Sequence, residues 1–382
     1  MSLFDDLYGG GIALSESQRM HWLRLIRSEQ VGPATFRDLI NHFGTAEQAL
    51  EALPGLARRG GAAGRIRVAP LSDIESELDQ AARLGARFIA MGEPDYPPWL
   101  RSIDSAPPVI LAKGHLAALK MPMIAIVGAR NCSVIGRKMT LRLARDLGEA
   151  GYGIASGLAR GIDGVAHEAS LQTGTIAVLA GGLDRIYPPE HESLAEQITP
   201  KGCLISEKPL GWTARAQDFP RRNRIVSGLS LATIVVEAAR RSGSLITADL
   251  ALKQNREIFA VPGSPLDPRA AGPNQLIKQG ASLVTTAKDV IDALRPIQGD
   301  AFPDPPAAAL QEGAAAKVSN LSDHDRNGIL DALSTAPVDT DALIRVTGLD
   351  SGAVYLALLE LDLAGRLARH PGNKVSLNGT LE

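Results

Sequence analysis

The feature that most constrains this chain is a series of short apolar runs in its middle part, each followed by a stretch with helical patterning. The runs cover residues 124–127, 152–155, 175–179, 203–206, 231–236, 257–261 and 282–284. Runs that are apolar on both faces are typical of strands buried in a parallel sheet, and the stretches between them can supply the right-handed crossovers. The pattern therefore predicts an α/β domain over residues 120–296: an extended Rossmann-like, doubly wound, mainly parallel sheet.

Smaller modules are expected on both sides, because 382 residues is long for one domain. Residues 1–60 predict a small helical module of the sterile-alpha-motif or helix-hairpin-helix kind, with a helix starting at Pro33 or Ala34. Residues 61–119, which include short apolar runs at 87–91 and 109–112, are interpreted as a connector packed on the central domain.

The C-terminal part predicts a linker and a winged helix. Residues 297–319 are rich in Pro and Ala and contain too little apolar sequence to fold alone. Residues 320–382 show three short helical patterns and then two strand-like pieces, 365–369 and 374–377. That order is typical of a winged helix-turn-helix.

Composition narrows the class of protein. Hydrophobic residues make up 45% of the chain, yet no run approaches the roughly 18 apolar residues of a membrane-spanning helix. The N-terminus lacks the basic start and apolar core of a secretory signal, so a cytoplasmic protein without membrane contact is expected. Cys132 and Cys203 lack the spacing of a metal site and are expected to be plain thiols. Because the net charge is −2, any nucleic-acid contact must come from a local basic patch.

Small residues follow most of the predicted strands. Ligands of parallel sheets bind beyond the carboxyl ends of the strands, where small residues let backbone amides approach an anion. The turns concerned are Gly128-Ala129-Arg130, residues 156–163, Gly181-Gly182, Ser242-Gly243-Ser244 and Pro262-Gly263-Ser264. The first turn lacks G-x-G-x-x-G spacing, and Gly136-Arg137-Lys138 is not a Walker motif, so hydride transfer and ordinary ATP hydrolysis lose support and no cofactor is expected.

Arginines gather at the same strand ends. Arg130 and Arg160 follow the first two runs, and Arg215, Arg221, Arg222 and Arg224 surround Phe219-Pro220. Guanidinium groups bind phosphate bidentately, and an aromatic ring beside them offers a face for a base, as in single-strand binders. Arg130 and Arg222 are expected to project beyond the strand ends. The alternative is that Arg221, Arg222 and Arg224 only solvate the start of a helix.

Several of these blocks resemble the signature blocks of the DNA-processing protein A family. They are Ser156-Gly157-Leu158-Ala159-Arg160-Gly161-Ile162-Asp163, Phe219-Pro220-Arg221-Arg222-Asn223-Arg224-Ile225-Val226-Ser227-Gly228-Leu229-Ser230, Ser242-Gly243-Ser244-Leu245-Ile246-Thr247-Ala248 and Gly272-Pro273-Asn274-Gln275-Leu276-Ile277 with Gly280-Ala281. The resemblance implies a single-stranded DNA pocket, homodimerisation, and protection of incoming DNA and its delivery to the RecA recombinase in natural transformation. It also implies that Arg130 and Phe219 belong to the pocket.

The strand-end residues and the resemblance together give the expected DNA-binding set. It comprises Gly128, Arg130, Ser156, Gly157, Arg160, Gly161, Asp163, Arg215, Phe219, Arg222, Asn223, Arg224, Ser242, Gly243 and Ser244. Two positions depart from the family pattern. Ala129 stands where a hydroxyl residue is common, and Arg215 is the nearest substitute for a lysine that commonly precedes the Phe-Pro block.

Two other functions compete with DNA binding by the central domain. One is an enzyme acting on nucleotides, such as the phosphoribohydrolases of the lysine-decarboxylase-like type, whose Pro-Gly-Gly-x-Gly-Thr-x-x-Glu block is absent here. Asp163, Asp184 and Glu237 are expected to cap helices or bind local amides, and His167 to be a packed or surface residue, so no catalytic residue is assigned.

The other competing function is a transcription factor that works through the winged helix. Its presumptive recognition helix, residues 351–363, contains Glu360 and Asp362 but neither Lys nor Arg, which suits a phosphate-lined groove poorly. The module is therefore expected to contact protein, or DNA only weakly, with Arg366, Arg369 and Lys374 near the wing.

Overall fold

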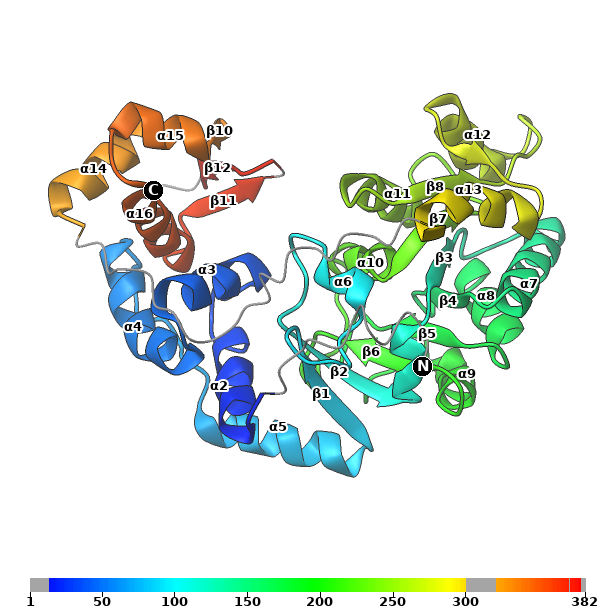
Figure 1. Ribbon diagram of the computed structural model, residues 1–382, viewed down its shortest axis with the longest axis horizontal. Helices are drawn as coiled ribbons and strands as arrows, with labels where there is room; N and C mark the ends of the chain where they lie inside the picture. The colour runs from blue at the N-terminus through cyan, green and yellow to red at the C-terminus, as the bar shows by residue number, and fades with distance from the viewer. Residues whose placement is uncertain (1–13, 300–320, 371, 379–382) are drawn as a thin grey trace. The chain divides into compact units, whose positions relative to one another are not determined.

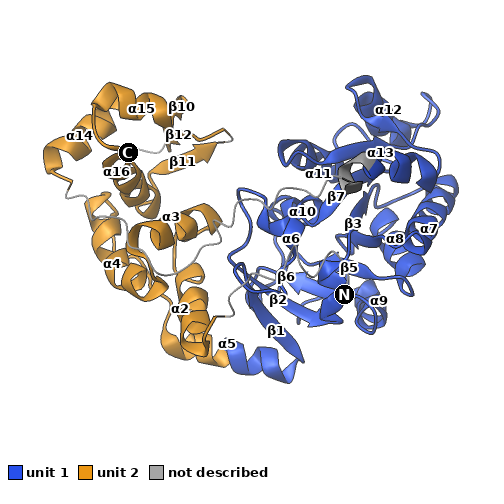
Figure 2. Cartoon of the chain, in the orientation of Figure 1, with its two compact units in different colours: residues 1–13, 77–308 blue, residues 14–76, 309–382 orange. Residues whose placement is uncertain are grey.

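The computed structural model describes residues 14–299, 321–370 and 372–378, which form two compact units (Figure 2). Unit 1 contains the described residues from 77 to 299. Unit 2 combines residues 14–76 with the described residues from 321 onward. The predicted linker at 297–319 lies outside the described residues, except where helix α13 (Ala287–Gly299) reaches into it.

Unit 1 is built on a nine-stranded sheet with the order β1-β2-β6-β5-β4-β3-β7-β8-β9 (Figure 1). The strands are β1 (Ala86–Ala90), β2 (Val109–Gly114), β3 (Met123–Val127), β4 (Gly153–Ser156), β5 (Thr175–Val178), β6 (Cys203–Ser206), β7 (Ser230–Val235), β8 (Glu257–Ala260) and β9 (Ser282–Leu283). Strands β3 to β9 pair in parallel, which confirms the mainly parallel sheet.

The segment at 61–119 contributes more than a connector. Strand β1 pairs antiparallel with β2, and β2 pairs antiparallel with β6, so both strands extend the sheet. The boundary expected at residue 120 therefore falls inside the sheet. Buried apolar residues of β1 and β2, such as Ile89 and Ile110, explain why these strands form part of the domain.

Helices cover both faces of the sheet. On one face, α7 (Val134–Glu149), α8 (Ile162–Ser170) and α13 share a core with β3, β4, β7 and β8. On the other, α10 (Asp218–Gly228) packs on α11 (Gly243–Lys253), and both contact β7. The remaining helices of unit 1 are α5 (Leu71–Arg83, which starts in unit 2), α6 (Pro98–Arg101), α9 (Glu192–Ile198) and α12 (Ala271–Lys278), with short 3₁₀ helices at Leu116–Lys120, Pro189–His191 and Pro268–Ala270.

The strand order places a switch point between β3 and β7. From β3 the chain adds β4, β5 and β6 outward on one side, then returns to place β7, β8 and β9 on the other side of β3. The connections after β3 and β7 therefore leave the sheet in opposite directions and open a crevice at the carboxyl ends of these strands, where such folds bind ligands.

Unit 2 contains a helical module and a winged helix. The first comprises α2 (Glu16–Ile26), α3 (Pro33–Phe43) and α4 (Ala46–Arg59), and α3 begins at Pro33 as expected. The second follows the order α14 (Asp323–Ala332), β10 (Val338–Asp339), α15 (Thr340–Thr347), α16 (Ser351–Leu363), β11 (Leu367–His370) and β12 (Lys374–Leu377). Its sheet has the order β10-β12-β11, which confirms the winged helix.

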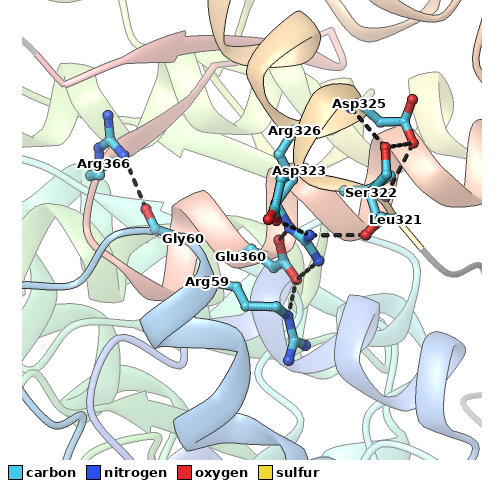
Figure 3. Close-up of polar contacts among 9 residues, drawn as sticks. All are labelled: Arg59, Gly60, Leu321, Ser322, Asp323, Asp325, Arg326, Glu360 and Arg366. Carbon is cyan, nitrogen blue, oxygen red and sulfur yellow. Dashed lines mark hydrogen bonds and ion pairs between the residues drawn. The ribbon is translucent and has the colours of Figure 1, made fainter.

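The expected recognition helix, α16, packs against α3 and α4 of the helical module. Its Glu360, whose side chain is only 2% exposed, accepts hydrogen bonds from Arg59 Nε at 2.5 Å and from Arg326 Nε at 2.7 Å (Figure 3). Nearby, Arg366 Nη1 donates to the Gly60 carbonyl at 3.2 Å. The helix thus contacts protein, as its acidic residues suggested, and the protein is the chain's own N-terminal module.

A second polar cluster joins the same two modules. Arg369 pairs with Asp38 of α3 at 2.7 Å and with Asp362 of α16 at 2.8 Å. Asp362 also accepts a hydrogen bond from Thr35 Oγ1 at 2.9 Å. Arg369, one of the few basic residues near the wing, is therefore engaged by two carboxylates.

The helices give little sign of a membrane span. Within residues 14–299 and the described C-terminal part, no single helix is long and apolar enough to cross a bilayer. Only α15 and α16 taken together, bent by 118°, reach that length and hydropathy.

Candidate single-strand-binding pocket

A pocket of about 1190 Å³ lies in unit 1 at the switch point between β3 and β7. Its walls come from the turns after β3, β4 and β7 and from the starts of α10 and α11. The expected residues that line it are Gly128, Arg130, Gly157, Asp163, Phe219, Arg222, Asn223, Ser242, Gly243 and Ser244. Outside its lining lie Ser156, Arg160, Gly161, Arg215 and Arg224.

Two of the arginines outside the pocket are paired with carboxylates. The exposed Arg160 pairs with Glu190, and Arg224, which is largely buried, pairs with Glu207. Arg224 also donates to the Ser105 carbonyl at 2.5 Å and so ties α10 to the loop before β2. Both guanidinium groups are therefore engaged within the chain.

Arg215 and Ser156 also have local roles. The exposed Arg215 lies with its guanidinium 4.9 Å from the centre of the Trp212 ring, so the structure does not bring this substitute for the family's lysine into the pocket lining. Ser156 is fully buried, and its hydroxyl donates to the Ile126 carbonyl of β3 at 2.7 Å.

Arg222 forms part of the pocket floor and is 5% exposed, so the expectation that it projects beyond the strand ends is wrong. Its Nη1 donates to the carbonyls of Gly157, at 2.5 Å, and Val178, which follow β4 and end β5. A Cβ atom at Gly157 would lie 2.5 Å from the Arg222 guanidinium, so glycine makes room for this arginine. Burial lowers the pKa of Arg222 to about 10, which leaves it charged at neutral pH.

Two anion-binding turns of the fold are already filled by carboxylates of the chain. Asp163 Oδ2 accepts hydrogen bonds from the amides of Gly157 at 3.1 Å and Ala159 at 3.4 Å. Glu237 accepts from the amide of Ser133 at 2.9 Å and from its hydroxyl at 2.5 Å, directly before α7. The contacts of Asp163 confirm that it binds local amides, whereas Glu237 binds a residue 104 positions away, which the sequence did not predict. Because these amides already donate to carboxylates, they are not available to a phosphate.

The remaining acidic and histidine candidates have local roles as well. Asp184 Oδ1 accepts from the Gly211 amide at 2.8 Å. His167 is buried with Nδ1 2.7 Å from Thr175 Oγ1, and burial lowers its pKa to about 3, which confirms a packed residue. Burial also raises the pKa of Asp163, against the opposing effect of the Arg222 charge.

The start of α11 is open to the pocket. Ser242 caps this 11-residue helix by accepting from the Ser244 amide, and a Cβ atom at Gly243 would meet nothing within 4 Å. By contrast, a Cβ at Gly128 would lie 2.6 Å from Ile162, so that glycine is explained by packing within the chain. Gly161, with φ +74°, is explained by its own backbone conformation. The Ser244 amide is used by this cap and the Leu245 amide donates to the Ser242 carbonyl at 3.1 Å, so an anion at this N-terminus would meet the Gly243 amide and the helix dipole.

Two exposed arginines flank this helix start. The Arg130 guanidinium lies 5.5 Å from the centre of the half-buried Phe219 ring, and Arg241 precedes Ser242. Among the described residues neither arginine has a carboxylate partner, whereas Arg269, also in the lining, is paired with Asp267 at 3.0 Å.

Arg241 and the exposed Tyr187 also line the pocket, and neither was expected there from the sequence. The position of Arg241 directly before the Ser242-Gly243-Ser244 turn was a usable signal. Tyr187 lies several residues beyond its strand, where only the folded loop returns it to the pocket.

Neither cysteine lies in the pocket lining. Cys132 is half-buried and Cys203 buried, and both are free, as expected. Burial raises the pKa of Cys203 to about 12. Within the described ranges no group of His, Cys, Asp and Glu residues is arranged to hold a metal ion.

Protein-family models match the central domain and the modules on both sides of it. The model described as DNA recombination-mediator protein A matches residues 87–295. A DprA-like N-terminal HHH domain matches residues 16–80, and a DprA winged helix domain matches residues 303–373. The N-terminal match favours the helix-hairpin-helix interpretation over the sterile-alpha-motif one.

Individual proteins are similar over much of the chain. Protein Smf of Escherichia coli K12 is 39% identical over 315 residues, which cover 81% of this chain and 82% of that protein. DNA processing protein DprA of Bacillus subtilis 168 is 45% identical over 213 residues, which cover 55% of this chain and 72% of that protein.

Two solved structures share the fold. DNA processing protein A from Streptococcus pneumoniae superposes with a TM-score of 0.60 at 33% identity, covering 74% of this chain and 98% of that one. A Helicobacter pylori DNA processing protein A, described for its single-stranded DNA binding mode, gives 0.51 at 28% identity, covering 56% and 96%.

Proposed function

The chain belongs to the DNA recombination-mediator protein A family, and we propose that its pocket between β3 and β7 binds single-stranded DNA. The observation that carries the proposal is the grouping of Arg130, Arg241 and Phe219 around the open N-terminus of α11. The single-stranded DNA binding described for the Helicobacter pylori relative supports it.

Each part of the pocket suits one part of a DNA strand. Phosphates bind the guanidinium groups of Arg130 and Arg241 and the Gly243 amide at the start of α11. A base stacks on the Phe219 ring, whatever its sequence, because every base has an aromatic face. Bases inside a duplex are paired and stacked, so a single strand is preferred.

We propose that binding proceeds without turnover. A nucleotide hydrolase needs a carboxylate free to act as acid or base beside the ligand. Of the carboxylates that line this pocket, Asp163 is bound by backbone amides and Asp267 is paired with Arg269. Incubation with nucleoside monophosphates should therefore release no base.

The winged helix is not proposed as the main DNA-binding element. Helix α16 would have to enter a groove, yet its Glu360 is buried against Arg59 of the N-terminal module. A regulator that works through this helix would first have to separate the two modules.

We further propose the cellular role that the family resemblance implies. The protein acts in the cytoplasm as a homodimer, protects incoming single strands and loads RecA onto them during natural transformation. Sedimentation of the purified protein tests the dimer. Assembly of RecA filaments on single strands that carry the bound protein tests the loading. A negative result in either assay would contradict only the role that the assay tests.

Reversing the charge of Arg130 or Arg241 is expected to weaken binding to labelled oligo(dT) by at least about 10-fold. A charge-assisted hydrogen bond is worth roughly 1.5–3 kcal/mol, and reversal adds repulsion to its loss. The affinities of Arg130→Glu and Arg241→Glu are measured by fluorescence anisotropy. The exposed Arg142→Glu on α7 is the charge-matched control and should bind within about 2-fold of wild type.

Equal affinity of both pocket variants and the wild type would place the DNA elsewhere. Melting temperatures of the variants should match the wild type, because both side chains are exposed.

A further inference from the structure

A second aromatic ring lies beside Phe219 in the pocket wall. The ring centre of Tyr187, in the loop between β5 and α9, is 5.6 Å from that of Phe219, with 61° between the ring planes. Tyr187 is 51% exposed and lines the same pocket, whereas Phe219 is half-buried. We propose that Tyr187 is a second base-stacking residue, so that the pocket holds two neighbouring bases; this inference rests on the proposed function.

The surroundings of Tyr187 argue for a ligand. Half of this large ring faces solvent inside a concave site, although aromatic rings gain most when they are covered. Its hydroxyl makes no hydrogen bond to any described residue.

The loop that carries Tyr187 is anchored at its start. The Gly182 amide donates to the Trp212 carbonyl at 2.9 Å, and Ser206 Oγ donates to the Gly181 carbonyl at 2.6 Å. A Cβ atom at Gly181 would lie 2.7 Å from the Trp212 carbonyl, so the two glycines let the loop pack closely on its neighbour. The Gly181-Gly182 pair, which the sequence suggested as a ligand contact, serves instead to seat this loop.

The inclination of the two rings gives them a role in selecting single strands. Planes inclined by 61° cannot both lie parallel to two bases stacked as in a helix. Two neighbouring bases could lie flat on Phe219 and Tyr187 only when splayed apart, which a flexible single strand allows and a duplex resists. Arg130, on the Phe219 ring, is placed to hold the phosphate between them.

Binding of labelled oligo(dT) by Tyr187 variants of the full chain tests the inference. Tyr187→Ala should weaken binding about 5- to 150-fold, the range for loss of one base–aromatic stack. Tyr187→Phe keeps the ring and should bind within about 2-fold of wild type. Tyr187→Leu keeps apolar packing without an aromatic face and should bind like the alanine variant.

Abasic oligonucleotides separate stacking from a structural effect. Oligonucleotides short enough to bind in a single register each carry one abasic site, which is moved along the strand. Wild-type binding should weaken when the abasic site is at either of two neighbouring positions. One of these penalties should vanish in Tyr187→Ala and the other in Phe219→Ala. A structural role of Tyr187 would leave both penalties in place in every variant.

The outcomes distinguish this inference from the proposed function. If Tyr187→Ala or Tyr187→Leu binds like the wild type while Arg130→Glu fails, the pocket is correct and the second stack is wrong. If the wild type itself does not bind oligo(dT), both proposals are wrong.

Discussion

Replacing Arg222 by alanine is expected to destabilise unit 1 by roughly 3–5 kcal/mol, the range for removing one of two buried charges that interact. The variant loses the donor to the carbonyls of Gly157 and Val178 and leaves the buried Asp163 without its nearby positive charge. Chemical denaturation followed by circular dichroism measures the change.

The next residue supplies a matched control. Arg221 is exposed at the start of the same helix, so Arg221→Ala should change the free energy of unfolding by no more than about 0.5 kcal/mol. Similar stabilities for the two variants would show that Arg222 does not hold the ends of β4 and β5 together. Weak DNA binding by Arg222→Ala alone would say nothing of a phosphate contact, because the fold changes first.

Glu360→Ala is expected to destabilise unit 2 by about 3 kcal/mol, the low end of the range for a buried pair. The low end applies because the Arg59 side chain is 43% exposed and can be hydrated again, while Arg326 is 20% exposed and loses a bidentate partner. Hydrogen exchange of the full chain should show weaker protection of both α4 and α16.

Asp323 provides the control, because it also pairs with Arg326 but its side chain is 98% exposed. Asp323→Ala should cost less than about 1 kcal/mol, as exposed pairs and charges at a helix start do. If Glu360→Ala loosens α16 and leaves the protection of α4 unchanged, the two modules do not unfold as one body.

Much of the fold could be predicted because its signals are local. Strands such as Thr175–Val178 and Cys203–Ser206 are short, apolar on both faces and ended by small residues, so sequence alone marks them. The place of β2 could not be found in this way. It depends on pairing with β6, for example Leu111 opposite Ser206, and no local pattern reveals a partner so far along the chain.

The site was harder to predict than the fold, because the type of a residue does not show whether its side chain points into the core or toward solvent. Arg221 and Arg222 are adjacent and identical in type, yet the turn of α10 exposes one and buries the other. Glu237 lies 104 residues from Ser133, whose amide it binds, so the filled anion site before α7 is invisible in the sequence. Tyr187 was missed for the same reason, since only the folded loop brings it to Phe219.

Photochemical cross-linking tests the location of the DNA most directly. Oligo(dT) carrying a single 5-iodouracil is bound to the full chain and irradiated, and the cross-linked peptides are identified by mass spectrometry. Because this base reacts with aromatic rings that it touches, the modified peptides should contain Phe219 or Tyr187, and excess unlabelled oligo(dT) should suppress them. Cross-links confined to unit 2, with none at the pocket between β3 and β7, would contradict the account.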